Sequence, residues 1–394
     1  MKTSLSHRIQ KVKPSPTLAV TALANQLRAE GRDVIGLAVG EPDFNTPDYI
    51  KQAAIEAINN NLTRYTAVDG TVGLKQAIIN KFKQENNLDF TEDQILVSVG
   101  GKQAIYNLCQ TLLNEGDEVI IPAPYWVSYP DIVKLADASP VIIEAGISQS
   151  FKITPEQLQQ AITDKTRLLI LNSPSNPSGK AYTRKELKAL SEVLLQHPEI
   201  VVMTDDIYEH IVWTDEGFNN ILNVYPELAE QTVVINGVSK AYCMTGWRIG
   251  YSAGPTEIIK GMKKIQSQST SNPTSIAQYA AQAALEGDQS FLKDMCDAFK
   301  ERHDYVYQTL SAMDGVEVLP CDGTFYSFPS FQAVIDRMDG IKDDIELAQL
   351  LLEKAEVALV PGSAFGMPGH LRLSFATNIE TLEKALNRIR QTIE

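Results

Sequence analysis

Two cations stand out in the stretch NGVSKAYCMTGWRIGY, residues 236–251, because its other residues are apolar or carry hydroxyl or amide groups. Charged side chains are costly to bury unless they are paired, so Lys240 and Arg248 beside a predicted strand indicate a chemical task. A lysine near other cations has a lowered pKa and becomes a nucleophile toward an aldehyde. Arg248 is permanently charged and suits a phosphate group.

The stretch SVGGKQA, residues 98–104, places two glycines between a predicted strand and a predicted helix. Free amide groups and the dipole at a helix N-terminus favour a phosphate, so this turn is a candidate phosphate site. The stretch lacks the pattern of a P-loop and that of a dinucleotide-binding fingerprint. Considered alone, it also fits a simple strand-to-helix turn.

Two further strand ends carry groups that can contact a planar ligand. Trp126 lies in the aromatic stretch PAPYWVSYP, residues 122–130, and can stack on a ring or fill the core. Asn176 lies in NSPSNPSG, residues 172–179, where it offers an amide at the end of a strand, although the stretch also fits an ordinary turn.

The stretch TDDIYEH, residues 204–210, ends another strand with two carboxylates. Because successive side chains of an extended segment point to opposite faces, Asp205 and Asp206 must point apart. We expect Asp205 to face the crevice, and Asp206 to face outward as a solvated charge or a helix cap.

These groups sit on a pattern that is typical of an α/β fold. Near-continuous apolar runs predict strands over residues 94–99, 118–123, 140–145, 167–173, 200–206, 232–239 and 248–254. Amphipathic helices, such as those expected over 102–113 and 183–196, alternate with them. This alternation predicts a mostly parallel, seven-stranded sheet flanked by helices, and in such sheets ligands bind at the carboxyl ends of the strands.

Taken together, the strand ends supply phosphate amides, an aromatic plate, an amide, a carboxylate with a nearby tyrosine, and a lysine with serine and arginine. A phosphorylated pyridine aldehyde needs the same set: a phosphate anchor, a stacking surface, an anion near the ring nitrogen, donors to the phenolic oxygen and an amine.

The chain resembles the class I aminotransferases of the pyridoxal-phosphate fold-type-I superfamily, and within them the bacterial aspartate aminotransferase subgroup. The resemblance runs from SHRIQKVKPSPT to the C-terminus. It is carried by SKAYCMTGWRIGY, the most specific motif, and by AVGEPDFNTP, VGGKQA, PYWVSYP, NSPSNPSG, DDIYEH and LRLSFA in the family's order.

The resemblance implies pyridoxal 5'-phosphate as cofactor. Lys240 would bind it as an imine and carry the proton in catalysis, and Asp205 would pair with the ring nitrogen. Asn176 and Tyr208 would bind the phenolic oxygen, and Trp126 would stack on the ring. The backbone at Gly101 and Lys102 would hold the phosphate, together with Ser239, Arg248 and Tyr65 of the neighbouring subunit.

The resemblance also implies a substrate site and a ping-pong transfer of the amino group from L-aspartate to 2-oxoglutarate. Arg372 would clamp the substrate α-carboxylate with Gly40 and Asn176, Trp126 would line the site, and Lys102 would bind the distal carboxylate. Prephenate, aromatic or other substrates and a β-lyase reaction stay open as alternatives, as does a non-catalytic, cofactor-binding sensor.

The resemblance further implies a homodimer with shared active sites. We expect a large cofactor-binding domain over residues 46–284, and a smaller α+β domain from 1–45 and 285–394. A long helical region is expected after residues 271–275 and runs through about 312. A helix over about 16–30 and the segment GLAVGEPDFNTP are expected to join the smaller domain. Tyr125 and Tyr129 are expected to be scaffold residues.

Composition excludes several other classes. The net charge is −14, from 35 Lys and Arg against 49 Asp and Glu, which disfavours nucleic acid as a partner. We find no signal peptide and no apolar run long enough for a membrane span. Four scattered cysteines predict a reducing cytoplasm, and neither they nor the histidines show the spacing of a metal site.

Overall fold

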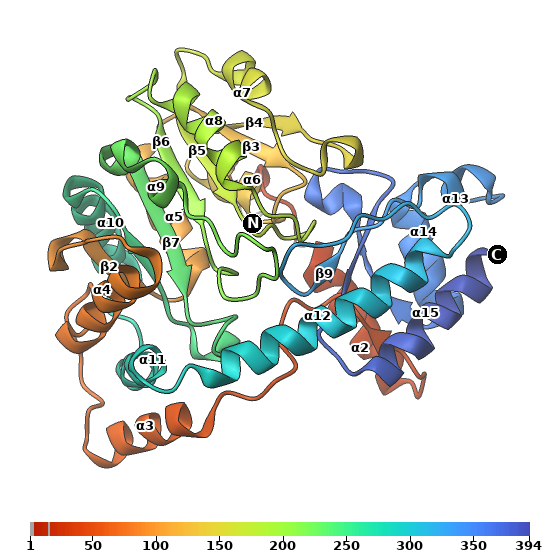
Figure 1. Ribbon diagram of the computed structural model, residues 1–394, viewed down its shortest axis with the longest axis horizontal. Coiled ribbons are helices and arrows are strands. Elements are labelled where there is room, and N and C mark those ends of the chain that lie inside the picture. Colours follow the sequence, from red (N-terminus) through yellow and green to blue (C-terminus); the bar gives the residue numbers. More distant parts are fainter. Residues whose placement is uncertain (1–3, 15) are drawn as a thin grey trace.

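The central element of the computed structural model, which describes residues 4–14 and 16–394, is a seven-stranded sheet of order β2-β8-β7-β6-β5-β3-β4 (Figure 1). Its strands are β2 (Ile95–Ser98), β3 (Glu118–Ala123), β4 (Ser139–Glu144), β5 (Thr166–Asn172), β6 (Val201–Asp205), β7 (Thr232–Gly237) and β8 (Gly250–Ala253). Among these seven, β8 alone runs antiparallel to its neighbours. The predicted sheet is therefore confirmed.

Helices cover both faces of this sheet because alternate strand residues are apolar on both sides. Ile120 and Leu169 pack into one core, whereas their neighbours Val119 and Leu168 pack into another. The first core is closed by α3 (Asp48–Asn59), α4 (Val72–Asn86), α7 (Pro155–Ala161), α8 (Arg184–Leu194), α9 (Ile221–Val224) and α11 (Ser275–Glu286). The second is closed by α5 (Gly101–Leu112), α6 (Tyr129–Leu135) and α10 (Thr256–Ser269).

A second group of elements lies beside the large sheet (Figure 1). Its strands are the parallel pair β1 (Ile35–Gly36) and β10 (Val357–Ala358), and the antiparallel set β11 (Val360–Pro361), β12 (Leu371–Ser374) and β9 (Tyr326–Ser327). Its helices are α2 (Pro16–Ala29), α12 (Ser290–Ser311), α13 (Gln332–Arg337), α14 (Asp344–Leu350), the π-helical turn Leu351–Ala355 and α15 (Ile379–Ile393). Two separate apolar cores hold this group together.

The long helix α12 runs from the large sheet to the second group (Figure 1). Its residue Leu292 packs against the cores of both parts, and Phe299 is buried in the core of the second group. The division of the chain at residues 45 and 284 into two domains stays a prediction.

Helix boundaries follow local capping chemistry. The expected helix over 183–196 begins with a capping box, in which Thr183 accepts from the Glu186 amide and the Glu186 carboxylate accepts from the Thr183 amide at 2.8 Å. The helices expected over 102–113 and 16–30 are confirmed as α5 and α2. The long helical region expected to run through about 312 is broken between α11 and α12, at Gly287.

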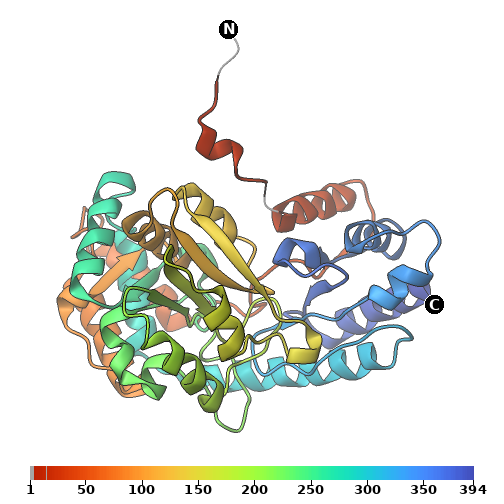
Figure 2. The same ribbon diagram turned by 90° about the horizontal axis from the view of Figure 1, so that it is seen from above.

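The N-terminal segment with α1 (His7–Gln10) extends away from the body of the molecule (Figure 2). Arg8 and Lys11 pair there with Asp137, at 2.9 and 3.3 Å. Short 3-10 turns occur at Glu92–Gln94, Ile147–Gln149, Pro226–Gln231, Thr245–Trp247 and Gly362–Phe365. Within the described residues, no helix combines the length and apolar character that crossing a bilayer requires.

Candidate active site

A cavity of about 720 Å³ lies at the carboxyl ends of the central strands. It is bounded by the large sheet and by the second group of elements, which contributes residues such as Tyr326 and Arg372. Of the twelve predicted site residues, the structure brings eleven to its wall: Gly40, Gly101, Lys102, Trp126, Asn176, Asp205, Tyr208, Ser239, Lys240, Arg248 and Arg372. Tyr65 is 91% exposed and does not line it.

Lys240 follows strand β7 and projects into this cavity. Its Nζ donates a hydrogen bond to the Gly40 carbonyl oxygen at 2.6 Å. Burial lowers the pKa of the Lys240 ammonium to about 8. The nearby Arg372 charge lowers this pKa further, whereas the Glu41 charge opposes the decrease. A useful fraction of neutral amine is therefore present near pH 7, as a nucleophile requires.

Asp205 ends strand β6 and is 7% exposed. The Tyr129 hydroxyl donates to Asp205 Oδ2 at 2.6 Å, and the Ile207 amide donates to Oδ1 at 3.4 Å. Burial raises the pKa of the Asp205 carboxyl to about 6, although the Tyr129 hydrogen bond and Lys240 oppose the rise. A cation beside Asp205 would relieve this cost of burial.

Asp206 points away from Asp205, as predicted, but the expectation that it faces solvent is wrong. It is 2% exposed, accepts from the Thr204 hydroxyl at 2.6 Å, and accepts a short hydrogen bond from Asn220. Burial, together with the nearby Glu209 charge, raises the pKa of Asp206 to about 8. The far side of β6 is packed rather than open because Asn220 and the start of α9 cover it.

A buried polar cluster continues beyond Asp206. Glu209 accepts hydrogen bonds from Lys81, Asn86 and Asn236. Glu85, Glu209 and His210 hold possible metal-ligand atoms within 4.8 Å of one another. The Lys81 ammonium contacts Glu209 and lies 3.5 Å from Glu85. It therefore provides the positive charge that a metal ion would bring to these carboxylates.

Arg372 lies on β12 and is 3% exposed. Its Nη1 donates to Asn176 Oδ1 at 2.9 Å and its Nη2 donates to the Ala38 carbonyl at 2.6 Å. Both partners are neutral, and burial lowers the pKa of the guanidinium. Among the described residues, its Nε is buried without a hydrogen-bond partner. A buried cation with spare donors is suited to a carboxylate.

The end of the cavity at α5 has the features of an anion site. Helix α5 begins at Gly101, and the first amide of the helix that donates to the Gly100 carbonyl is that of Gln103, at 3.1 Å, so the Gly101 and Lys102 amides are left for a ligand. Gly100 has φ +80°, and a Cβ there would collide with the Arg248 guanidinium, which therefore packs directly on this turn. A Cβ on Gly250 would collide with the Gly101 amide. Both glycines permit close packing of the backbone.

Trp126 and Lys102 lie together on the cavity wall. The Lys102 Nζ is 4.9 Å from the Trp126 ring centroid. Partial burial and the nearby Arg248 lower the pKa of the Lys102 ammonium. The Trp126 ring packs edge-to-face against the Tyr129 ring, with centroids 5.3 Å apart, and this contact orients the Trp126 ring.

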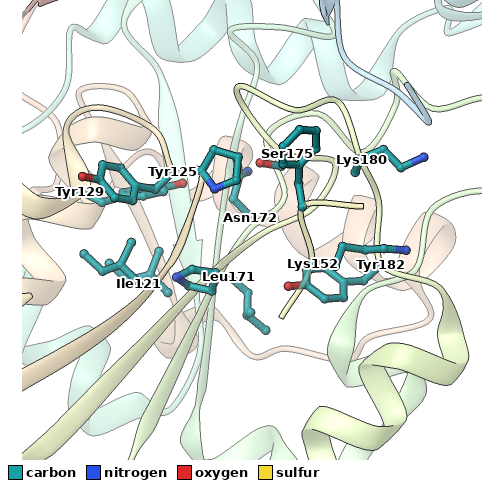
Figure 3. Close-up of a pocket in the computed structure, with 13 residues that line it drawn as sticks. Ile121, Tyr125, Tyr129, Lys152, Leu171, Asn172, Ser175, Lys180 and Tyr182 are labelled. Carbon is teal, nitrogen blue, oxygen red and sulfur yellow. The ribbon is translucent and has the colours of Figure 1, made fainter. Parts of the chain in front are cut away.

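A smaller cavity of about 20 Å³, whose lining residues Figure 3 shows, adjoins the main one. Tyr129 and Asn172 line both cavities. Asn172 donates to the Asp205 carbonyl at 2.9 Å and accepts from the Asn176 amide at 2.8 Å. Asn172 therefore ties together the backbones that carry two predicted cofactor residues.

The chain is similar to known proteins over nearly its whole length. Residues 32–389 match the family described as aminotransferase class I and II. The chain is 56% identical to the aspartate/prephenate aminotransferase of Nitrosomonas europaea, over 98% of each chain. It is 50% identical to the aspartate aminotransferase of Geobacillus stearothermophilus, over 99% of each.

Solved structures agree with this match. The aspartate aminotransferase of Rhizobium meliloti superposes with a TM-score of 0.96 at 46% identity, covering 99% of each chain. The Thermus thermophilus aspartate aminotransferase with maleate gives 0.93 at 40% identity, covering 99% of this chain and 100% of that one.

The chain belongs to the aminotransferase class I and II family. Members of this family depend on pyridoxal 5'-phosphate, and the resemblance stated from the motifs is confirmed. The residues present fit the cofactor. The cavity offers a buried amine of lowered pKa, a buried carboxyl of raised pKa that favours a cation, and a helix N-terminus with free amides.

Two residues with contacts in this cavity were not predicted from the sequence. Tyr129, which was expected to be scaffold, donates to the Asp205 carboxylate. Tyr326, which no motif singled out, contacts Tyr208 and Arg372. Nothing in the sequence distinguishes either from the other tyrosines, because their partners lie far along the chain.

Proposed function

We propose that this aminotransferase moves the amino group of L-aspartate to 2-oxoglutarate in two half-reactions. The observation that carries the proposal is one cavity that contains the Lys240 amine together with two cations, Arg372 and Lys102. A dicarboxylate substrate presents two anionic groups, and each favours a cationic partner. The relatives named aspartate aminotransferase, and the Thermus thermophilus structure with the dicarboxylate maleate, support this substrate class.

The cofactor, when bound, supplies an aldehyde carbon for the amine and a ring that withdraws electrons from the substrate Cα. Lys240 would hold the aldehyde carbon through its amine until the substrate amine takes its place. The amine of Lys240 that is released in this exchange would accept the proton from the substrate Cα and return it at the cofactor's C4′ atom. Asp205 would hold the proton on the ring nitrogen. We assign the remaining contacts to Asn176 and Tyr208 at the phenolic oxygen, Trp126 at the ring face, and Gly101, Lys102, Ser239 and Arg248 at the phosphate.

Arg372 would orient the substrate through its α-carboxylate. Two of its five N–H groups bind Asn176 and Ala38, which leaves Nε and two further N–H groups for the carboxylate. The Gly40 amide and Asn176 would support the same group. Fixing the carboxylate sets the angle of the Cα–H bond to the ring, and so lowers the entropic part of the barrier.

We assign Lys102 to the distal carboxylate, and this assignment gives a direct test. For Lys102→Ala we expect kcat/KM for L-aspartate to fall about 10- to 100-fold, since a hydrogen bond to a charged group contributes about 1.5–3 kcal/mol. The value for L-alanine, which has no distal carboxylate, should change less than about 3-fold. Stopped-flow half-reactions with L-aspartate, L-glutamate, L-phenylalanine and L-alanine measure both.

Lys260→Ala is the matched control, because Lys260 is an exposed lysine paired with Glu257 at 2.8 Å on helix α10. It should leave all four half-reactions unchanged. Equal losses for aspartate and alanine in Lys102→Ala would contradict the assignment of its side chain to the distal carboxylate. A wild-type cofactor spectrum that does not respond to L-aspartate would overturn the proposed function itself.

Prephenate is a second candidate acceptor. The relatives from Nitrosomonas europaea and Cereibacter sphaeroides, at 56% and 54% identity, are named aspartate/prephenate aminotransferases. Prephenate also carries two carboxylates, so the same two cations can bind it. Rates of the second half-reaction, measured with 2-oxoglutarate and with prephenate, show which of these two acceptors the enzyme prefers.

We also propose a homodimer in which Tyr65 contacts the cofactor phosphate bound by the partner subunit. Around α3 and the loop before α4 the chain exposes Ile55, Ile58, Leu62, Tyr65 and Val72, with exposed fractions of 48%, 51%, 38%, 91% and 69%. Such clustering of exposed apolar side chains is typical of an interface. A second copy of the chain is the partner that this proposal requires, because Tyr65 would contact the cofactor phosphate in that copy.

Subunit mixing tests this shared site. We expect Lys240→Ala and Tyr65→Ala homodimers to be impaired, whereas their heterodimer regains one native site, with about half of the wild-type activity. Mixing Lys240→Ala with Arg248→Ala is the control, because both residues act within one subunit and no native site can form. Equal activity in the two mixtures would contradict the shared site.

A cytoplasmic location is likewise proposed. Cys109, Cys243, Cys296 and Cys321 are all free thiols in the structure. Burial raises the pKa of Cys109, Cys243 and Cys321 to about 12, so these thiols are unreactive at neutral pH. Unpaired cysteines are typical of a reducing compartment.

A further inference from the structure

Tyr326 occupies a central position in the cavity that the proposed function leaves without a role. It lies on β9, where it pairs with Ser374 of β12, and it is 1% exposed. Its side chain reaches the cavity wall beside Tyr208 and Arg372. These residues come from different parts of the chain, since Tyr208 follows β6 of the large sheet.

Three contacts define its surroundings. The Tyr326 and Tyr208 hydroxyl oxygens lie 3.0 Å apart in a hydrogen bond. The Arg372 guanidinium carbon lies 4.4 Å from the Tyr326 ring centroid. A Cβ on Gly40 would collide with the Tyr326 hydroxyl, so that hydroxyl packs directly on the Gly40 backbone. One side chain thus contacts three residues assigned to the cofactor or the substrate.

The hydrogen bond to Tyr208 has a direction that matters. A tyrosine hydroxyl has one proton to donate. If Tyr208 donates its proton to the phenolic oxygen of the cofactor, it can only accept from Tyr326, and Tyr326 must be the donor. The ring of the same Tyr326 lies against Arg372, where it orients the guanidinium.

We propose that Tyr326 is a positioning residue that couples the carboxylate site at Arg372 to the hydrogen bond between Tyr208 and the cofactor. This inference rests on the proposed function. A carboxylate bound by Arg372 neutralises a cation beside the cofactor-bound amine, and Tyr326 transmits the accompanying shift of the guanidinium to Tyr208. The charge at one end of the substrate thereby adjusts the hydrogen bond at the cofactor.

The test uses the pH midpoint of the visible absorbance change of the holoenzyme, with and without maleate. In the wild type, maleate should raise this midpoint, because an anion beside Arg372 favours the protonated chromophore. In Tyr326→Phe, which keeps the ring and loses the hydroxyl, we expect maleate affinity within about 3-fold of wild type. The rise in midpoint should shrink by more than half, and kcat should fall about 5- to 10-fold, the equivalent of one neutral hydrogen bond.

Tyr326→Leu removes the ring as well and should weaken maleate binding about 10-fold, since the guanidinium loses its stacking surface. Tyr242→Phe is the matched control: Tyr242 is buried, and its hydroxyl has no hydrogen-bond partner among the described residues. It should behave as wild type. In a Tyr208→Phe background, Tyr326→Phe should have no further effect on the midpoint, because the coupling passes through Tyr208.

A Tyr326→Phe enzyme with wild-type midpoint, maleate response and kcat would overturn the coupling. So would full additivity of the Tyr208→Phe and Tyr326→Phe effects on the midpoint. Neither of these two results would affect the proposed function. The proposed function fails only if the wild-type cofactor spectrum does not respond to L-aspartate.

Discussion

Lys240→Ala should reduce kcat for aspartate transamination by at least about 10⁴-fold, the upper end of what a general acid–base group contributes. In the proposed function the same residue also supplies the amine that binds the cofactor, so two functions should be lost at once. In the structure, burial lowers the pKa of Lys240 to about 8, and its side chain lines the cavity. Steady-state assays with L-aspartate and 2-oxoglutarate measure the loss.

The Lys240→Ala protein should nevertheless fold. Its amine makes one hydrogen bond, to the Gly40 carbonyl, and burial already penalises its charged form. We therefore expect a melting temperature of the apoenzyme within about 3 °C of wild type. A small primary amine such as methylamine, added to the assay, should restore part of the proton transfer. Retention of more than about 1% of wild-type kcat would exclude Lys240 as the proton-transfer residue.

Strand positions could be predicted well because burial on both faces leaves a strong signal. The run EVIIPA was predicted as a strand over 118–123, and β3 has the same bounds. Its residues Val119 and Ile120 pack into different cores, so no polar position interrupts the run. The order of the strands, and the reversed direction of β8, depend on long-range pairing and were not predicted.

Most predicted site residues came from motifs at strand ends and lie where a parallel sheet must bring them, whereas Gly40, Tyr65 and Arg372 were implied by the family resemblance alone. The errors concern partners that are distant in sequence. Asp206 is buried because Asn220 covers it, and TDDIYEH contains no sign of Asn220. Tyr326 contacts Tyr208 only because β9 lies beside the large sheet. Such contacts depend on how separately formed elements pack together.

Asp205→Asn should have the second-largest effect on activity. It removes the carboxylate that the proposed function assigns to the ring nitrogen, but preserves the shape of the side chain and an oxygen that can accept from Tyr129. Loss of one preorganised electrostatic contact costs about 10²- to 10³-fold in kcat, and we expect a loss of at least that size. Asp205→Glu, which retains the charge, should recover part of it. Equal kcat in the Asn and Glu variants would contradict an electrostatic role.

The same substitution should stabilise the apoenzyme, because Asp205 is kept at a cost to the fold. Its pKa is about 6 in the folded protein, against about 3.9 in an unfolded chain. The unfolded chain therefore releases its proton at lower pH, and the folded protein loses stability as the pH rises from about 4 to 6. The loss then stays constant at higher pH, at about 3 kcal/mol.

Asparagine does not titrate, so the advantage of Asp205→Asn over wild type should grow by about 1 kcal/mol between pH 5 and pH 8. Urea denaturation of the two apoenzymes at both pH values measures this difference.

Adding pyridoxal 5'-phosphate should make the wild type more stable than the Asp205→Asn variant. A cation on the ring nitrogen pairs with Asp205 in the wild type and has no anion to pair with in the variant. An advantage that is independent of pH, or a larger cofactor-induced stabilisation of the variant, would contradict this account. The buried carboxyl is thus unfavourable in the empty fold and becomes favourable when its cationic partner binds.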